Sequence, residues 1–200
     1  MARAGLTRER VVEAAADLAD EIGLENITVS ALARGFGVKD ASLYSHVRNI
    51  ADLRARIALR ATGELADLIG PAVAGRSGKD ALTAFADAYR GFALKHPGRY
   101  AATNLQLDPA LAAEAPGPRR VAEYTYALLR GYDLAEPDLT DAVRLLRSTF
   151  HGYVDLELSA GFGHPRDVRT SWHRSVDALH VLLEHWPTSK RTAPERTASA

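Results

Sequence analysis

The chain has 200 residues, of which 46% are apolar, so it can form one large domain or two smaller ones with substantial cores. It contains no cysteine, which excludes a disulfide scaffold and any thiolate metal site. Its 25 basic and 25 acidic side chains balance, so the net charge gives no support for nucleic-acid binding. No stretch is apolar for long enough to span a membrane, and the N-terminus lacks a signal-peptide core. We therefore expect a cytoplasmic protein without membrane contact.

The first predicted helix covers residues 7–22, where apolar side chains recur every three or four positions. Thr7 is a suitable N-cap, and Gly23 ends the helix. A second, shorter helix begins after Thr28, whose hydroxyl can accept a hydrogen bond from a first-turn amide. Gly37 can end this helix because glycine readily adopts a left-handed conformation. The spacing thus predicts two short helices joined by a tight turn.

The next predicted helix is held to the core by Leu43 and Val47, which lie four residues apart. Its other face carries residues that are short or can donate hydrogen bonds, and none is acidic: Ala41, Ser42, Tyr44, Ser45 and His46. A helix packed on one side, with small polar groups on the other, suits a DNA major groove. The alternative is that these are ordinary surface residues of a helical bundle.

The remainder of the chain also has helical periodicity, and we find no convincing strand. Asn49 and Asp52 have capping-box spacing before a helix expected to stop at Gly70-Pro71, and Ser77 and Asp80 repeat that spacing. Further helices are expected near residues 78–95, 100–105, 121–131, 139–158 and 168–186, with a loop over 108–118. We predict an all-α protein with domains at 7–67 and 68–186 and a disordered tail at 187–200.

Aromatic side chains are spread over the second half of the chain and form a candidate cavity lining. The candidates are Phe85, Tyr89, Phe92, Tyr124, Phe150 and Tyr153. Tyrosine hydroxyls need polar partners or a wet cavity, so the set favours a site for an apolar or aromatic ligand. For any one of these residues, core packing is the competing explanation.

Catalytic and metal-binding patterns are absent from the sequence. There is no GxSxG, HExxH or phosphate-binding glycine loop, so we expect neither an enzyme nor a bound cofactor. His173, His180 and His185 share the last helix, but a metal site needs further ligands, so we predict none there.

The segment GVKDASLYSHVRN, which begins at Gly37 and follows a capped helix, resembles the TetR family of bacterial transcriptional regulators. The resemblance covers about residues 7–60. Two later segments, HPGRYAA from His96 and FHGYVDLE from Phe150, are similar to a subgroup named after a Trp-His-Gly motif. The first position of that motif is Phe150 here.

This resemblance implies an all-helical homodimer in which a TetR-type helix-turn-helix domain binds double-stranded operator DNA. The last two helices would form the dimer interface, and the C-terminal domain would bind a small-molecule effector. Carried over by position, Thr28 would contact phosphate, and Tyr44, His46 and Arg48 would reach the DNA backbone. Residues facing the groove would be Lys39, Ala41, Ser42 and Ser45.

Three positions depart from the family pattern. Lys39 stands where the family commonly has a capping serine, so we expect Asp40 to cap instead. Gly35 lies within the second helix, which costs about 1 kcal/mol on an exposed face. Ile50 replaces a common lysine and removes one phosphate contact.

The expected function is a ligand-responsive regulator, a repressor released from its operator by a small apolar or aromatic molecule. Ligand binding would tilt the helix over 50–69 and change the spacing of the two DNA-binding domains. The alternative is an all-α binding or assembly protein that never contacts DNA, which the balanced charge favours.

Overall fold

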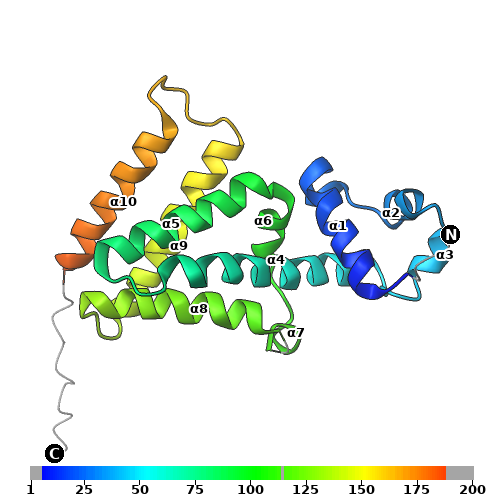
Figure 1. The fold of residues 1–200 in the computed structure, drawn as a ribbon, viewed down its shortest axis with the longest axis horizontal. Helices are drawn as coiled ribbons and strands as arrows, with labels where there is room; N and C mark the ends of the chain where they lie inside the picture. Colours follow the sequence, from blue (N-terminus) through cyan, green and yellow to red (C-terminus); the bar gives the residue numbers. More distant parts are fainter. Residues whose placement is uncertain (1–5, 114, 188–200) are drawn as a thin grey trace, which may run out of the picture.

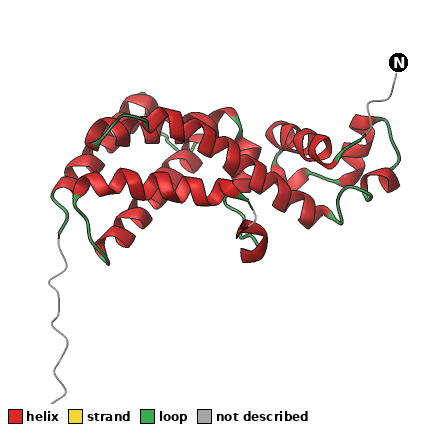
Figure 2. Ribbon diagram, turned by 60° about the horizontal axis from the view of Figure 1, so that its bottom comes forward, coloured by secondary structure: helices red, strands yellow, loops and turns green. Residues whose placement is uncertain are grey.

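The computed structural model describes residues 6–113 and 115–187, and within these ranges it contains helices and no strand (Figures 1 and 2). The all-α prediction is therefore confirmed. The helices are α1 (Arg8–Ile22), α2 (Val29–Phe36), α3 (Asp40–Leu43), α4 (Ile50–Val73), α5 (Gly78–Lys95), α6 (Pro97–Thr103), α7 (Pro109–Ala113), α8 (Pro116–Leu129), α9 (Asp138–Leu158) and α10 (Val168–Glu184). Short 3-10 turns cover Leu24–Asn26 and Arg130–Tyr132. No helix in these ranges is long and apolar enough to cross a membrane.

One end of the molecule, called the head here, consists of α1, α2, α3 and the first half of α4 (Figure 1). Its core is one cluster of aliphatic side chains that includes Val11, Ile27, Leu43, Leu53 and Ile57. α1 begins where the sequence predicts, because the Thr7 hydroxyl accepts a hydrogen bond from Arg10 N at 3.3 Å. Packing of Leu43 in this core fixes the orientation of α3 at the outer end of the head.

The larger part, called the body, packs α5 and α8 against the second half of α4, and α9 and α10 pack in turn against α5 (Figure 1). Its core includes Leu82, Phe92, Leu129, Phe150 and Trp172, all almost completely buried. The indole Nε1 of Trp172 donates a hydrogen bond to Asp87 at 3.0 Å, so its single polar group is satisfied.

Two helices join the head to the body. α4 contributes Ile57 to the head core and Ile69 to the body core. α6 does the same over a few residues, since Ala102 lies in the head core and Tyr100 in the body core. Because α4 belongs to both cores, the domain boundary at residues 67–68 stays a prediction.

α4 continues through Gly70-Pro71 to Val73, so the predicted stop at this dipeptide is wrong. Proline forfeits one backbone hydrogen bond here, but its ring fixes φ at a helical value. The loss falls in the last turn, where Ile69 and Val73 pack on the body core and hold the chain in place.

The predicted loop over residues 108–118 is also wrong, because it contains α7 and the start of α8. Pro109 and Pro116 each occupy the first helical position, where a missing N–H costs nothing. Sequence composition suggested a loop because proline and glycine are common there. Gly117 instead serves close packing, since a Cβ at this position would lie 2.6 Å from Gly63 N on α4.

The Ser77 side chain makes no capping hydrogen bond, so the predicted capping box with Asp80 is absent. Gly78, the first helical residue, has a left-handed φ of 52°, so the backbone departs from helical geometry at the point where the capping box would begin. Of the tail predicted at residues 187–200, residues 188–200 lie outside the described residues.

Candidate nucleic-acid interface and cavity

The turn between α2 and α3 has the predicted geometry. The Thr28 hydroxyl accepts a hydrogen bond from Ala31 N at 3.1 Å and caps α2. Gly37 ends α2 in a left-handed conformation with φ of 65°, and Val38 N then donates to Ala33 O at 3.0 Å. This compact turn sets the angle between the two helices.

α3 is shorter than predicted, because regular helix ends at Leu43 and residues 44–46 form a turn. His46 N donates to Leu43 O at 2.9 Å, which is the spacing of a tighter turn, and Val47 N donates to the same oxygen at 3.1 Å. Leu43 and Val47 are nonetheless buried in the head core, as predicted. The side chains after Leu43 therefore keep a helix-like arrangement without a regular second turn.

Asp40 does not cap α3, so this prediction is wrong. The N-cap position is Lys39, which makes no side-chain capping hydrogen bond, and Asp40 is the first helical residue. Its carboxylate instead accepts a hydrogen bond from the Ser30 hydroxyl on α2. The aspartate therefore ties the two helices of the motif together.

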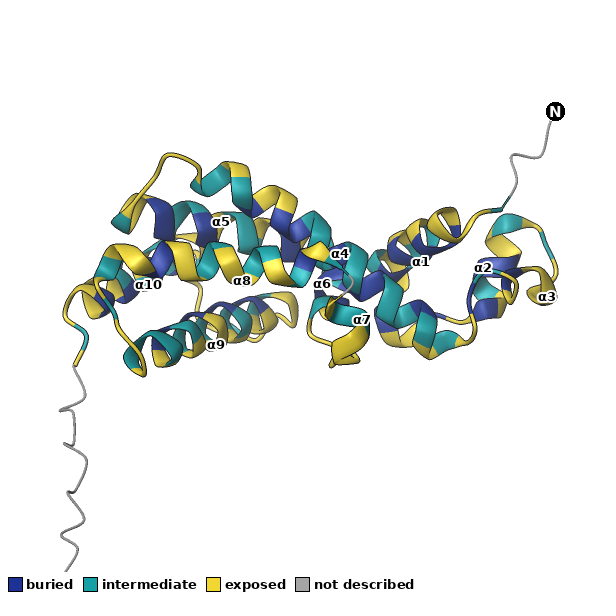
Figure 3. Cartoon of the chain, turned by 90° about the horizontal axis from the view of Figure 1, so that it is seen from below, coloured by how far each residue is buried: buried dark blue, intermediate teal, exposed yellow. Residues whose placement is uncertain are grey.

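The residues proposed to contact DNA lie in α3 and beside it in the chain, except Thr28, which is the N-cap of α2; Figure 3 shows the exposed surface of α3 at the outer end of the head. All are exposed except His46, which is half-buried: Thr28, Lys39, Ala41, Ser42, Tyr44, Ser45, His46 and Arg48. Tyr44 has 54% of its surface exposed, which is unusual for a large aromatic side chain without a partner. The Ser45 hydroxyl donates to Ser42 O at 2.8 Å.

A basic hollow of about 170 Å³ lies beside this surface. Its lining includes the arginines at positions 8, 48 and 56 together with Asp52. Arg8 Nε donates to His46 O at 3.1 Å, and Arg56 Nε contacts Asp52 at 3.1 Å. Burial raises the pKa of Asp52, but hydrogen bonds from Arg56 and from Arg48 N outweigh it and hold the pKa below its usual value. The negative charge is therefore neutralised within the hollow.

Arg8 and Arg56 were not among the predicted site residues. They come from α1 and α4, and the fold brings them next to His46. No local motif marks them in the sequence. The pairing of Asp52 with Arg56, one helical turn apart, was the one available signal.

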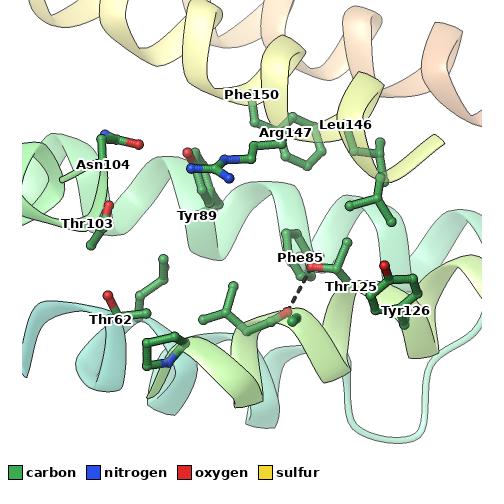
Figure 4. Close-up of a pocket in the computed structure, with 15 residues that line it drawn as sticks. Thr62, Phe85, Tyr89, Thr103, Asn104, Thr125, Tyr126, Leu146, Arg147 and Phe150 are labelled. Atoms are coloured by element: carbon green, nitrogen blue, oxygen red, sulfur yellow. Dashed lines mark hydrogen bonds between the residues drawn. The ribbon is translucent and has the colours of Figure 1, made fainter. Parts of the chain in front are cut away.

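A cavity of about 270 Å³ lies in the body among α4, α5, α6, α8 and α9 (Figure 4). Its wall is formed by Thr62, Leu65, Phe85, Tyr89, Thr103, Asn104, Pro118, Val121, Ala122, Thr125, Tyr126, Val143, Leu146, Arg147 and Phe150. Most of these side chains are apolar, and the polar ones are mainly hydroxyls and one amide.

Three of the six aromatic residues proposed for a ligand site line this cavity, namely Phe85, Tyr89 and Phe150. The other three lie elsewhere. Phe92 is buried in the core with its ring 5.6 Å from that of His96. Tyr124 packs against Gly70. The Tyr153 ring meets the Trp172 ring edge-on at 5.1 Å and the Phe162 ring at a tilt at 4.8 Å.

The polar residues of the cavity were missed, because threonine, asparagine and arginine at scattered positions carry no periodic signal. They are Thr62, Thr103, Asn104, Thr125, Tyr126 and Arg147. They converge only because α4, α6, α8 and α9 surround the same space.

A chain of hydrogen bonds runs from the cavity wall into α6 and α9. The hydroxyls of Tyr89 and Tyr100 lie 3.1 Å apart, and the Tyr100 hydroxyl lies 2.6 Å from His151 Nδ1. Burial raises the pKa of both phenols, so both stay neutral at physiological pH. Tyr100 therefore links the wall of the cavity to α6.

The opposite side of α6 is bound to α1 by charged groups. Arg99, a residue with only 7% of its surface exposed, forms ion pairs with Asp17 and Asp20 of α1 and with Glu64 of α4. His96 Nδ1 also lies 2.9 Å from Asp20. Neighbouring residues of one short helix thus contact the cavity network and the head.

The histidines of α10 contact separate partners. His173 Nε2 lies 3.2 Å from Asp87, and His180 Nε2 lies 3.4 Å from Glu184. His185 Nδ1 contacts a carbonyl of its own helix.

Comparisons with known proteins agree with the head-and-body arrangement. A family model described as the C-terminal domain of tetracyclin-repressor-like proteins matches residues 82–179. The TetR of Acinetobacter baumannii AYE, solved with minocycline, has 20% identity and a TM-score of 0.68 over 92% of this chain and 100% of that one. The fold is therefore that of the TetR regulators.

Two relatives are also similar to this chain in sequence. The uncharacterized HTH-type transcriptional regulator YobS of Bacillus subtilis is 32% identical, with 87% of this chain and 91% of YobS covered. The uncharacterized HTH-type transcriptional regulator Rv0681 of Mycobacterium tuberculosis is 36% identical, with 78% of this chain and 72% of Rv0681 covered. The chain belongs to the TetR family of DNA-binding transcriptional regulators.

Proposed function

We propose that this regulator is a dimeric repressor that leaves its operator when a small, largely apolar molecule occupies the cavity. The observation that carries the proposal is the position of α6. Thr103 of α6 and the residue that caps this helix, Asn104, line the cavity, whereas Arg99 of α6 is paired with Asp17 and Asp20 of the head. A ligand that displaces α6 would therefore change how the head is held.

The DNA contacts are proposed in two groups. Lys39, Ala41, Ser42 and Ser45 would face the base edges of the major groove, where the small side chains allow close approach. The remaining residues, Thr28, Tyr44, His46 and Arg48, would contact the phosphate backbone, and Arg8 joins them because it borders the same hollow. Phosphate contacts position the head, and base contacts select the sequence.

α4 is the helix proposed to transmit ligand binding from the cavity to the DNA-binding head. It begins beside the candidate DNA surface and passes the cavity at Thr62 and Leu65. A small tilt of this rigid helix would move the two heads of a dimer off successive major grooves, which lie about 34–36 Å apart. The ligand shifts this equilibrium only if it binds the tilted state more tightly.

The proposed dimer forms through α9 and α10. Exposed apolar side chains on these helices include Leu156 at 45%, Val181 at 55% and Leu182 at 40% exposure. Such residues favour burial against a second copy, since they would otherwise remain in water. The TetR variant of similar fold was solved in complex with minocycline, which supports a small-molecule ligand for this chain.

Binding to the DNA just upstream of the protein's own gene tests the DNA contacts. We expect the wild-type protein to protect a defined segment in a footprint. The double variant Tyr44→Ala/His46→Ala loses at least about tenfold in affinity, because two backbone contacts are removed. Arg119→Ala, which changes an exposed charge on α8, is the control and keeps wild-type affinity.

The competing function is an all-α assembly protein that does not contact DNA. If the double variant binds DNA as tightly as the wild-type protein does, this result favours the alternative and contradicts the proposed DNA contacts of Tyr44 and His46. A folded double variant, with an unchanged circular dichroism spectrum and melting temperature, is required for either conclusion.

A further inference from the structure

The cavity wall has one charged group. Among its described lining residues, Arg147 of α9 is the only side chain with a formal charge, and no acidic residue faces it there. Figure 4 shows the guanidinium beside Tyr89. Arg147 also acts on Tyr89 electrostatically. Burial raises the pKa of Tyr89, and the positive charge of Arg147 opposes that rise. Arg147 is thus a single cationic group on a largely apolar wall.

Within residues 6–113 and 115–187, Arg147 forms no hydrogen bond or ion pair. The preceding arginine on the same helix, Arg144, is paired with Asp141 at 3.4 Å. Arg90 is bound by Glu157 on the same side of the body. The guanidinium of Arg147 therefore has its donors available at the cavity.

The three threonines of the wall have used their hydroxyl donors. The hydroxyls of Thr62 and Thr125 donate to the carbonyls of Ala58 and Val121, at 2.7 and 2.9 Å. The Thr103 hydroxyl donates to Tyr100 O at 2.7 Å. These threonines therefore offer the cavity acceptor lone pairs and a methyl group. Asn104 donates one amide hydrogen to Tyr100 O at 3.2 Å, and its second amide hydrogen and the Tyr126 hydroxyl are neutral donors of the wall. Arg147 is the one charged donor among the described lining residues, so an anionic group would find its counter-charge there.

We propose that the effector is an amphipathic anion, a small molecule with an apolar body and one carboxylate or comparable acidic group that binds Arg147. The body would contact Leu65, Phe85, Val121, Leu146 and Phe150, which supply apolar and aromatic surface. The acid would form a charge-assisted, bidentate pair with the guanidinium. This proposal rests on the proposed ligand-responsive function, and it names the chemical class of the ligand.

Three probes with one aromatic body and different head groups separate charge from shape: 2-naphthoate, 2-naphthylmethanol and 2-naphthylmethylammonium. Octanoate and octan-1-ol form a second pair with an aliphatic body. Calorimetric titration of the full chain measures each affinity. We expect each acid to bind at least about tenfold more tightly than its alcohol, as a hydrogen-bonded charge pair implies, and the ammonium to bind most weakly.

Arg147→Gln is expected to remove the preference for the acids and to leave the alcohols unaffected. Arg144→Gln is the matched control, because it removes a charge from the same helix outside the cavity, and it keeps the preference. Equal binding of acid and alcohol, no binding of either acid, or a preference that survives Arg147→Gln would overturn the proposal. Loss of the dimer in Arg147→Gln with binding unchanged would also overturn it, by assigning Arg147 to the interface between copies.

These outcomes are distinct from a failure of the proposed function. Binding of 2-naphthoate that depends on Arg147 but leaves DNA affinity unchanged would support the ligand class and contradict ligand-induced release. Release of DNA by a neutral ligand in the Arg147→Gln variant would support release and contradict the ligand class.

Discussion

Two glycines of the head, Gly35 and Gly37, affect its stability in different ways. Gly37 is required by its backbone, since its φ of 65° is a conformation that side chains with a Cβ rarely adopt. Gly35, two residues earlier, has no such requirement, and a Cβ there would meet nothing within 4 Å. Its cost to α2 is therefore conformational entropy alone.

Gly35→Ala is expected to raise the free energy of unfolding by about 0.5–1 kcal/mol, because alanine is the better helix former. Gly37→Ala, the matched variant at the next glycine, is expected to lower it by about 1 kcal/mol because of its left-handed backbone. Urea titration of both variants measures the two changes. A destabilised Gly35→Ala protein would show that α2 needs flexibility at this point.

The sequence predicts residue roles well where the signal is local. Thr28, Gly37, Leu43 and Val47 all have the positions expected of them, because capping, left-handed turns and helical burial depend on near neighbours. Asp40 does not, because its partner is Ser30 on another helix. Arg147 and Asn104 share a cavity wall for a tertiary reason that no sequence window contains.

At the scale of the helix, α6 connects the cavity wall to the head. It lies against α1 so closely that a Cβ on Gly98 would be 2.0 Å from the Ala19 carbonyl carbon. Its hydrogen bonds reach the cavity network through Tyr100, while Arg99 holds the head. The sequence indicated a helix break at His96-Pro97-Gly98, but it could not indicate that the piece that follows bridges two cores.

Gly98→Ala is expected to lower the free energy of unfolding by about 3 kcal/mol or more. The added Cβ would clash with backbone atoms of α1, which cannot move aside as a flexible side chain can. Gly91→Ala on α5, where a Cβ meets nothing within 4 Å, is the control and leaves stability unchanged or slightly raised. Chemical denaturation of both variants gives the comparison. Equal stabilities would mean that α6 does not pack on α1 in this way.

At the scale of the whole molecule, exposed apolar side chains lie on the two helices farthest along the chain. They include Leu156 and Val181, but other exposed leucines, such as Leu68 and Leu94, lie on α4 and α5. The dimer through α9 and α10, which the resemblance implied, therefore stays a prediction. The fold class followed from periodicity over long segments, whereas helix ends near proline and glycine did not, because packing on the body core decided them.

Val181→Asp is expected to convert the dimer to a monomer, because a charge would be buried without a partner at the interface. Leu94→Asp, which also places a charge on an exposed leucine but lies on α5, is expected to leave the dimer intact. Light scattering coupled to gel filtration measures the mass of each. A dimeric Val181→Asp protein would place the interface elsewhere.

The central claim is that occupation of the cavity controls the affinity for DNA. The direct test is fluorescence anisotropy of the protected promoter fragment, titrated with protein alone and with protein saturated by a ligand shown to bind the cavity. We expect the dissociation constant for DNA to rise about tenfold or more, within the range of ordinary allosteric coupling. Equal dissociation constants at ligand saturation would contradict the claim.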